Sequence, residues 1–262
     1  MTTNEILQTL KANPTANTYE GETKLNIQKT ARFAGILYLI ITVAAMIAHF
    51  YVPSKIIVPG DPATTAQNII DNQALFRIGG VGSELIILLS EIILSVVLYV
   101  IFKPVNKTLS LLAAVSRLAM TTIHGINLLN YFFVMLLLSG AGYLAVFDAE
   151  QLNALMMVFL EAHSVGFTIG IAFLTLHVFI LGYLIFKSGY FPKVLGVLFI
   201  AAAIGYLVDS FALLLFSGYE TTPGVIQAVI VISEIAFPLW LLIKGVNLEG
   251  WQKRNADLPH EG

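Results

Sequence analysis

The chain contains no cysteine and few charged residues: Asp, Glu, Lys and Arg together make up 11% of its 262 residues. Without thiols, neither a disulfide framework nor a thiolate metal site can form, so any metal would need histidine and carboxylate ligands. An average soluble domain carries roughly 25% charged residues. This chain instead has 57% hydrophobic residues and a mean hydropathy of +0.83, which is the composition of a membrane protein.

Motifs of nucleotide-driven and serine-dependent chemistry are also missing. The sequence has no GxxxxGK[ST], no HExxH and no GxSxG. The glycine-rich stretch GGVGSE (79–84) opens an apolar segment and lacks the strand–turn–helix setting of a dinucleotide site. The net charge of −2 suggests no nucleic-acid partner. We therefore predict no catalytic residues and no organic cofactor.

Six apolar segments are long enough to cross the roughly 30 Å hydrocarbon core of a bilayer, which takes about 20 helical residues. They cover residues 33–52, 75–102, 109–139, 152–186, 194–217 and 224–245. We predict an all-α six-helix transmembrane bundle over 31–246, between a polar N-terminal segment (1–30) and a polar tail (247–262). The N-terminal segment lacks the apolar stretch of a cleaved signal, so the first span is expected to remain as an anchor.

Basic residues predict the orientation of the bundle, because cytoplasmic loops carry the excess of Lys and Arg. Eleven of the fourteen fall on one side: Lys11, Lys24, Lys29, Arg32, Lys103, Lys107, Lys187, Lys193, Lys244, Lys253 and Arg254. The opposite loops carry mainly acidic residues, namely Asp61, Asp71, Asp148, Glu150 and Glu220. Both termini are predicted to be cytoplasmic, with the chain spanning the plasma (inner) membrane of a prokaryote several times.

The first outer loop, PGDPATTAQNIIDNQALF (59–76), predicts a short interfacial helix. Asp61 is a favourable N-cap residue, and Pro62 suits the first helical position. The simpler interpretation is a capped surface helix without chemistry. The alternative is a lid over an outward-facing cavity.

Eleven polar side chains fall at depths that should be hydrocarbon: Glu84, Glu91, Arg117, His124, Asn127, Asn130, Glu161, His163, His177, Asp209 and Glu234. A charged residue at mid-bilayer costs about 2.5–3.5 kcal/mol on insertion scales. These groups therefore need partners, protons or water.

The second and third segments suggest specific partners, because both carry polar residues seven positions apart, a spacing that returns to nearly the same helix face. The short connection KPVNK (103–107) makes them an antiparallel hairpin, in which residue numbers at equal depth add to a constant. This register predicts three contacts: Glu84 with His124, Glu91 with Arg117 as a structural ion pair, and Arg77 with Tyr131. The simpler interpretation is that such pairs only hold two helices together.

The fourth segment adds Glu161 and His163, and its Gly166 and Gly170 form a GxxxG pair typical of close helix packing. Five polar residues are predicted to lie in the outer half of the membrane, namely Glu84, His124, Glu161, His163 and Asp209. His49 can reach the same level. Such a cluster can relay protons or bind a ligand. Its imidazoles and carboxylates, His124, His163, Glu161 and Asp209, are also candidate ligands for a divalent metal.

Several stretches resemble one family: ARFAGILYLI (31–40), VPGDPATTAQNI (58–69), LFRIG (75–79), LYVIFKPVN (98–106), AHSVGFTIG (162–170), LGYLIFKSGYFPKVLGVL (181–198) and IGYLVDS (204–210). They are similar to bacterial and archaeal membrane proteins known as domain of unknown function 4386. The resemblance implies a polytopic membrane protein and supports the predicted topology. It implies no activity and no catalytic residues.

Three functions fit the sequence. The first is a proton-coupled, transporter-like or small-ligand-binding protein that uses Glu84, His124, Glu161 and His163. The second is an intramembrane metal-dependent enzyme acting on a lipid or small amphiphile. The third is a structural or regulatory membrane partner in which every polar pair only joins helices. Bilayer lipids and a small molecule are the expected partners.

Overall fold

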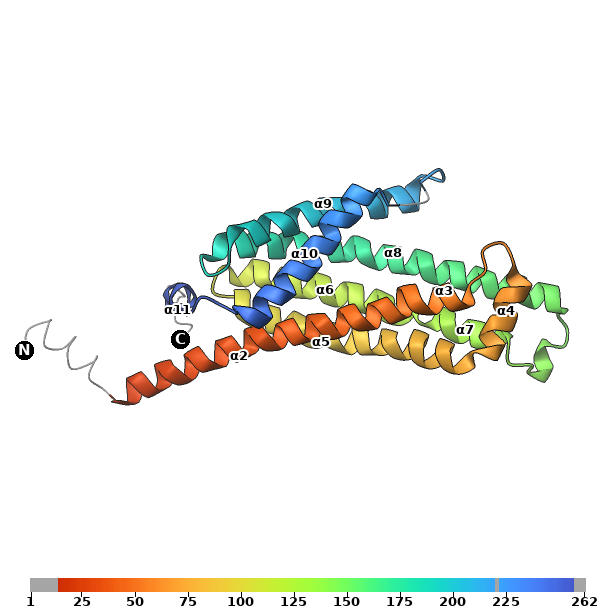
Figure 1. Ribbon diagram of the computed structural model, residues 1–262, viewed down its shortest axis with the longest axis horizontal. Helices are drawn as coiled ribbons and strands as arrows, with labels where there is room; N and C mark the ends of the chain where they lie inside the picture. Colours follow the sequence, from red (N-terminus) through yellow and green to blue (C-terminus); the bar gives the residue numbers. More distant parts are fainter. Residues whose placement is uncertain (1–13, 220–221, 257–262) are drawn as a thin grey trace, which may run out of the picture.

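The protein is a multi-pass membrane protein built from helices (Figure 1). A computed structural model describes residues 14–219 and 222–256, and within these ranges the chain contains no strand. Six helices are long and apolar enough to span a membrane, so the predicted fold class and the number of spans are confirmed. Lys11 and Glu220, which were used above to predict the orientation, lie outside the described residues. Residues 1–13 and 257–262 of the two predicted terminal segments also lie outside them.

The helices follow the predicted segments closely. The first span consists of α2 (Pro14–Ala45), the π-helical η1 (Met46–Tyr51) and α3 (Val52–Ile56), and the short α4 (Pro62–Asp71) follows it. The next two spans are η2 (Leu75–Gly82, π-helical) with α5 (Ser83–Phe102), and α6 (Lys107–Asn127) with α7 (Leu129–Leu137). After a 3-10 turn, η3 (Gly142–Leu144), the chain forms α8 (Ala149–Ser188), α9 (Lys193–Leu215), α10 (Gly224–Ile243) and α11 (Leu248–Ala256).

The long helices α2, α5, α6 and α8 run along the long axis of the molecule, and α10 crosses them at an angle (Figure 1). We call the two ends of the bundle the α4 end and the α11 end, after the short helices that lie there. α8 packs against both α6 and α9, while α2 packs against α5 and α10. With 40 residues, α8 is about 60 Å long, so it extends beyond a hydrocarbon core of about 30 Å, as its sequence predicts.

Helix caps fix the loops at the α4 end. The Asp61 carboxylate accepts the Thr64 backbone N–H at 2.9 Å and the Thr64 hydroxyl at 2.6 Å, which confirms the predicted start of α4. These hydrogen bonds favour the charged carboxylate and lower the pKa of Asp61. Asp148 and Gln151 form a capping box that starts α8.

Two apolar clusters fill the interior, and the buried polar residues separate them. The cluster toward the α11 end includes Leu94, Ala113 and Val178, whereas the cluster at the α4 end includes Leu88, Leu128 and Leu160. Glu91 on α5, residues 117–124 on α6 and residues 163–177 on α8 lie in chain order between these two sets. The sequence therefore places a polar layer inside the bundle.

Candidate functional site

The predicted contact between Glu91 and Arg117 is present in the polar layer. The Arg117 Nε–H donates to Glu91 Oε2, and both side chains are buried. Arg117 Nη1 also lies 2.9 Å from His177 Nε2, and the guanidinium lies 5.3 Å from the centre of the Tyr38 ring. We call Tyr38, Glu91, Arg117 and His177 the arginine cluster. It joins α2, α5, α6 and α8.

His177 is held in one neutral form by its two neighbours. Its Nδ1 lies 2.9 Å from the Ala113 carbonyl oxygen, which can only accept a hydrogen bond. Its Nε2 faces Arg117, whose guanidinium can only donate. The ring therefore carries its proton on Nδ1 and presents a lone pair at Nε2, which makes His177 an acceptor for the buried cation.

Glu84 lies between two imidazoles nearer the α4 end. Its Oε1 atom is 3.6 Å from His49 Nε2 and 3.7 Å from His163 Nε2, and the residue is only 3% exposed. Among the described residues, this oxygen has no hydrogen-bond partner. We call His49, Glu84 and His163 the histidine cluster. It joins the first, second and fourth spans.

Both π-helical turns lie beside the histidine cluster. His49 belongs to η1, and Glu84 follows η2 by two residues. The two turns contact each other, and η2 also packs against α3. A Cβ atom added to Gly79 of η2 would lie 2.8 Å from Val52 Cγ2 of α3, so the close approach of η2 to α3 depends on glycine. A π turn bonds residue i to residue i+5, which shifts all later side chains around the helix axis, and such turns are frequent at functional sites.

The predicted contact between Glu84 and His124 is not formed. His124 Nε2 lies 3.1 Å from the Phe167 carbonyl oxygen, and its ring stacks on the Phe167 ring with centres 4.9 Å apart. The same Phe167 ring also packs against His49, with centres 4.6 Å apart. Glu84 and His124 therefore lie on neighbouring helices but face different partners, because the His124 side chain contacts the backbone of α8 instead.

Arg77 does not lie on the stripe of Glu84 either. The π turn η2 includes Arg77, so the seven-residue spacing to Glu84 no longer returns to the same face, and the Arg77 side chain is exposed. Phe76 packs against Tyr131 instead, with ring centres 5.0 Å apart. Tyr131 in turn stacks on His163 at 3.9 Å with nearly parallel rings. A chain of rings thus leads from the α4 end to the histidine cluster.

The glycine pair on α8 makes room for polar side chains of α6. A Cβ atom on Gly166 would collide with the Asn127 amide, and one on Gly170 would collide with the His124 ring. Asn127 Nδ2 donates to the His163 carbonyl oxygen at 2.8 Å. The predicted GxxxG packing is therefore a contact between glycine and side chains, which sets the positions of His124 and Asn127.

Two other residues of the predicted polar group, Glu161 and Asp209, belong to neither cluster. Glu161 is exposed, and Asp209 accepts hydrogen bonds from the Tyr219 hydroxyl at 2.7 Å and the Thr222 hydroxyl at 2.9 Å. The bond to Asp209 raises the pKa of Tyr219 to about 12. Glu234 accepts a hydrogen bond from Tyr206, which joins α9 to α10.

The predicted metal ligands are not brought together. Among the described residues, no group of three or more His, Asp or Glu side chains is arranged to hold a metal. Of the four candidates, His124 and His163 lie inside the bundle, whereas Glu161 is exposed and Asp209 belongs to the loop contact between α9 and α10. The four candidate ligands therefore do not converge on one point in the part of the chain that the structure describes.

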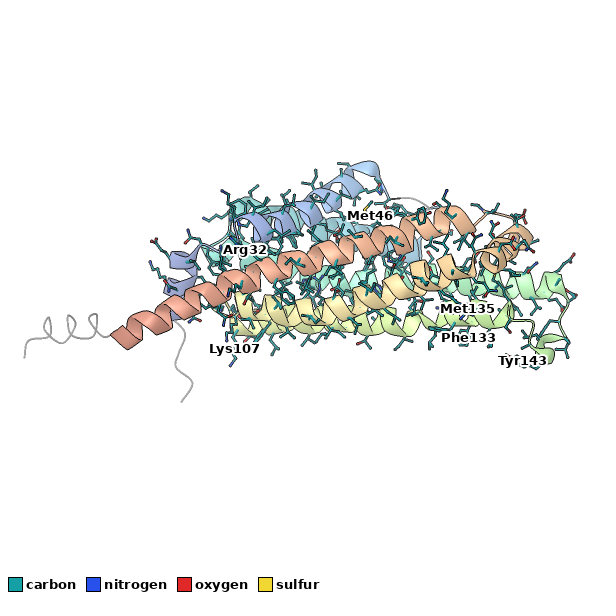
Figure 2. The ribbon with its side chains drawn as sticks, turned by 60° about the horizontal axis from the view of Figure 1, so that its bottom comes forward. Arg32, Met46, Lys107, Phe133, Met135 and Tyr143 are labelled. Carbon is teal, nitrogen blue, oxygen red and sulfur yellow. The ribbon has the colours of Figure 1, made fainter. Side chains whose placement is uncertain are left out.

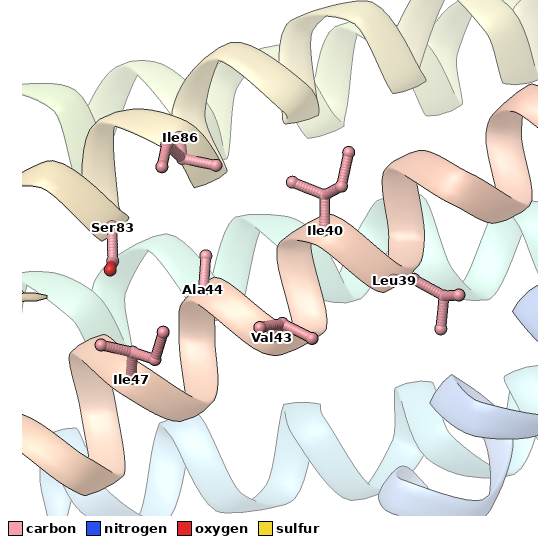
Figure 3. A pocket seen from close by; sticks show the side chains of 7 residues that line it. All are labelled: Leu39, Ile40, Val43, Ala44, Ile47, Ser83 and Ile86. Carbon is pink, nitrogen blue, oxygen red and sulfur yellow. The ribbon is translucent and has the colours of Figure 1, made fainter.

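A shallow apolar groove of about 360 Å³ lies beside the histidine cluster, on the face between α2 and α5 (Figure 3). Leu39, Ile40, Val43, Ala44, Ile47, Ser83 and Ile86 line it. Its lining residues belong to the first two candidate membrane spans. Ser83 precedes Glu84 directly in the chain, so the groove borders the residue that carries the buried carboxyl group.

The histidine cluster can store and transfer protons. Both distances from Glu84 to the imidazoles exceed the 2.7–3.2 Å of a hydrogen bond, so transfer requires an approach of about 0.5 Å or a bridging water. Imidazole nitrogens and carboxylate oxygens can both accept and release protons. By contrast, the arginine cluster keeps a permanent cation opposite Glu91, which suits a structural role.

Comparison with known proteins identifies relatives over most of the chain. The model of a family described as Domain of unknown function (DUF4386) matches residues 33–245. A protein of Archaeoglobus fulgidus, described as an uncharacterized protein, is 32% identical over 168 residues, which cover 64% of this chain and 84% of the relative. No solved structure matches the chain.

Proposed function

The chain belongs to the DUF4386 family, and within it we propose a proton-coupled membrane protein, transporter-like or small-ligand-binding, in which Glu84 exchanges protons with His49 and His163. One observation carries the proposal: the buried Glu84 Oε1 lies within 3.7 Å of both imidazoles and has no hydrogen bond among the described residues. A carboxylate with a purely structural role would be expected to have such a bond. A small molecule is the proposed ligand.

The position of Arg117 supports a proton site that is reached only from the α4 end. The cation lies at the next level of the polar layer toward the α11 end, two helical turns of α5 beyond Glu84. Arg117 stays protonated and holds Glu91 in an ion pair, so neither group is free to pass a proton on toward the α11 end. Protons that reach Glu84 from the α4 end would therefore stop there, as coupling to a ligand requires, instead of leaking through the bundle.

The proposed orientation places the α4 end outside the cell and both termini in the cytoplasm of a prokaryote, at its plasma membrane. Arg32 and Lys107 lie toward the α11 end and Tyr143 lies at the α4 end (Figure 2), which supports this orientation by the positive-inside rule. The chain has no cysteine, so single cysteines can be labelled without background. We expect a membrane-impermeant maleimide to label Val146→Cys in intact cells and Lys103→Cys only after permeabilisation. Labelling in the reverse order would contradict the orientation.

Nitrogen NMR of the five histidines tests the proton exchange. In reconstituted protein labelled at the imidazole nitrogens, we expect the His49 and His163 signals to change between pH 5 and 8 as the Glu84 carboxyl group between them takes up a proton. Glu84→Gln should abolish both changes together, because it removes the shared acidic group. Glu161→Gln is the matched control, since the same change on an exposed glutamate should leave both titrations unchanged.

His177 is an internal reference for the same experiment, because its two partners fix its neutral tautomer. Its signals should stay constant over this pH range in the wild type and in Glu84→Gln. Constant His49 and His163 signals in the wild type, or titrations that ignore Glu84→Gln, would refute the proposed exchange.

A further inference from the structure

A cavity of about 200 Å³ lies at the α4 end, between α4, η2 and α7. Its apolar lining includes Ile69, Phe76, Met135 and Leu138, and its polar lining consists of Gln73, Arg77 and Ser139. Drug-sized ligands occupy sites of 300–1,000 Å³, so this cavity fits only a small molecule.

Arg77 supplies the charge of this cavity. Among the described residues, no carboxylate, hydrogen-bond acceptor or aromatic ring pairs with its guanidinium. The π turn η2 carries this side chain away from the buried stripe of Glu84. Arginine matches a carboxylate geometrically through two parallel N–H···O bonds, so an anionic ligand fits this lining.

The wall formed by α4 is held in place before any ligand binds. The Asn68 side chain donates to the Ile56 carbonyl oxygen at 3.0 Å, and the Thr65 hydroxyl accepts the Val58 N–H at 3.0 Å. Both bonds tie α4 to the chain that enters it from α3, and Thr65 is fully buried. A wall fixed in this way reduces the ordering that a ligand would have to impose.

The floor of the cavity connects to the histidine cluster. Phe76 lines the cavity and packs against Tyr131, which stacks on His163. His163 faces Glu84 at 3.7 Å. A molecule seated on Phe76 is thus three side-chain contacts away from the buried carboxyl group.

We propose that this cavity binds a small monocarboxylate with a short hydrocarbon chain, whose carboxylate pairs with Arg77 and whose chain lies on Phe76 and Met135. The lining combines one free cation with both apolar and polar side chains, which suits a small anion with a short apolar part, and a cavity of about 200 Å³ does not hold a long acyl chain. This inference names the ligand class for the function proposed above. Binding itself requires no proton exchange at Glu84, so the two proposals can fail separately.

Hexanoate is a suitable probe, with hexanol as the uncharged control. In full-length protein in nanodiscs of zwitterionic lipid, we expect saturable hexanoate binding by ligand-observed NMR and much weaker binding of hexanol. Arg77→Gln should weaken hexanoate binding about tenfold or more, as expected for loss of a charged hydrogen-bonded pair. Arg77→Lys should retain part of the affinity, and Met135→Trp should abolish binding by filling the cavity.

Lys55→Gln is the matched control, because it removes the other basic residue near the α4 end without touching the cavity, and it should leave the affinity unchanged. Equal binding to Arg77→Gln, equal binding of hexanol, or no binding to the wild type would overturn the proposal. Loss of hexanoate binding in nanodiscs of anionic lipid would also overturn it, since a lipid headgroup would then be the ligand. Glu84→Gln should still bind hexanoate, which separates this test from that of proton exchange.

Discussion

Replacing Arg117 by methionine is expected to lower the free energy of unfolding by about 3–5 kcal/mol, the largest effect we predict. The change leaves the Glu91 carboxylate buried without its partner, and it leaves the His177 Nε2 lone pair without a donor. Reversible unfolding in mixed micelles with increasing SDS measures this difference.

The double variant Glu91→Met with Arg117→Met is the control for this prediction. Removing both charges leaves no uncompensated ion, so most of the lost stability should return, because apolar replacements of whole buried ion pairs are often neutral or stabilising. Equal losses in the single and double variants would show that the pair contributes through side-chain shape, and would contradict a structural role for its charges.

Replacing Glu84 by methionine is expected to have the opposite sign and to raise the free energy of unfolding by about 1–3 kcal/mol. The Glu84 Oε1 atom is buried without a hydrogen bond among the described residues, so folding desolvates it without compensation. An unbranched apolar side chain of similar length removes that penalty and keeps the packing. The same SDS titration measures the gain.

Glu161→Met is the matched control on an exposed glutamate and should change stability by no more than about 0.5 kcal/mol. A loss of stability in Glu84→Met comparable to that of Arg117→Met would show that Glu84, like the Glu91–Arg117 pair, is structural. The two glutamates, seven residues apart on one helix, would then have the same role.

The spans and their order follow from the sequence because composition and length decide them. Hydropathy alone was enough to predict the six helices, and the capping preference of Asp61 was enough to predict the start of α4. The contact of Glu91 with Arg117 was predictable because α5 and α6 are regular α-helices at these residues, so the hairpin register holds.

The other two hairpin contacts failed for local reasons. Arg77 lies in the π turn η2, whose only hint in the sequence is the glycine-rich stretch GGVG (79–82) at its end, and no spacing rule predicts the shift. His124 lies near the predicted level, but it turns to the backbone of α8, a helix outside the hairpin. Contacts with a third helix depend on tertiary packing, and the register of a two-helix hairpin gives no information about it.

The histidine cluster was also only partly predictable from the sequence. The contact of His49 with Glu84 depends on how α2 packs, which no short loop dictates. One part was accessible from the sequence: residues two apart on a helix point about 200° from each other, so Glu161 and His163 cannot both face the interior. The structure buries His163 and exposes Glu161.

Infrared difference spectroscopy on reconstituted protein tests the central claim, exchange of a proton at Glu84, most directly. Between pH 5 and 8, the wild type should gain the carbonyl stretch of a protonated carboxylic acid as the pH falls, and one part of this band should be missing in Glu84→Gln but present in Glu161→Gln. An identical band in the wild type and in Glu84→Gln, or the absence of any such band in the wild type, would contradict proton exchange at Glu84.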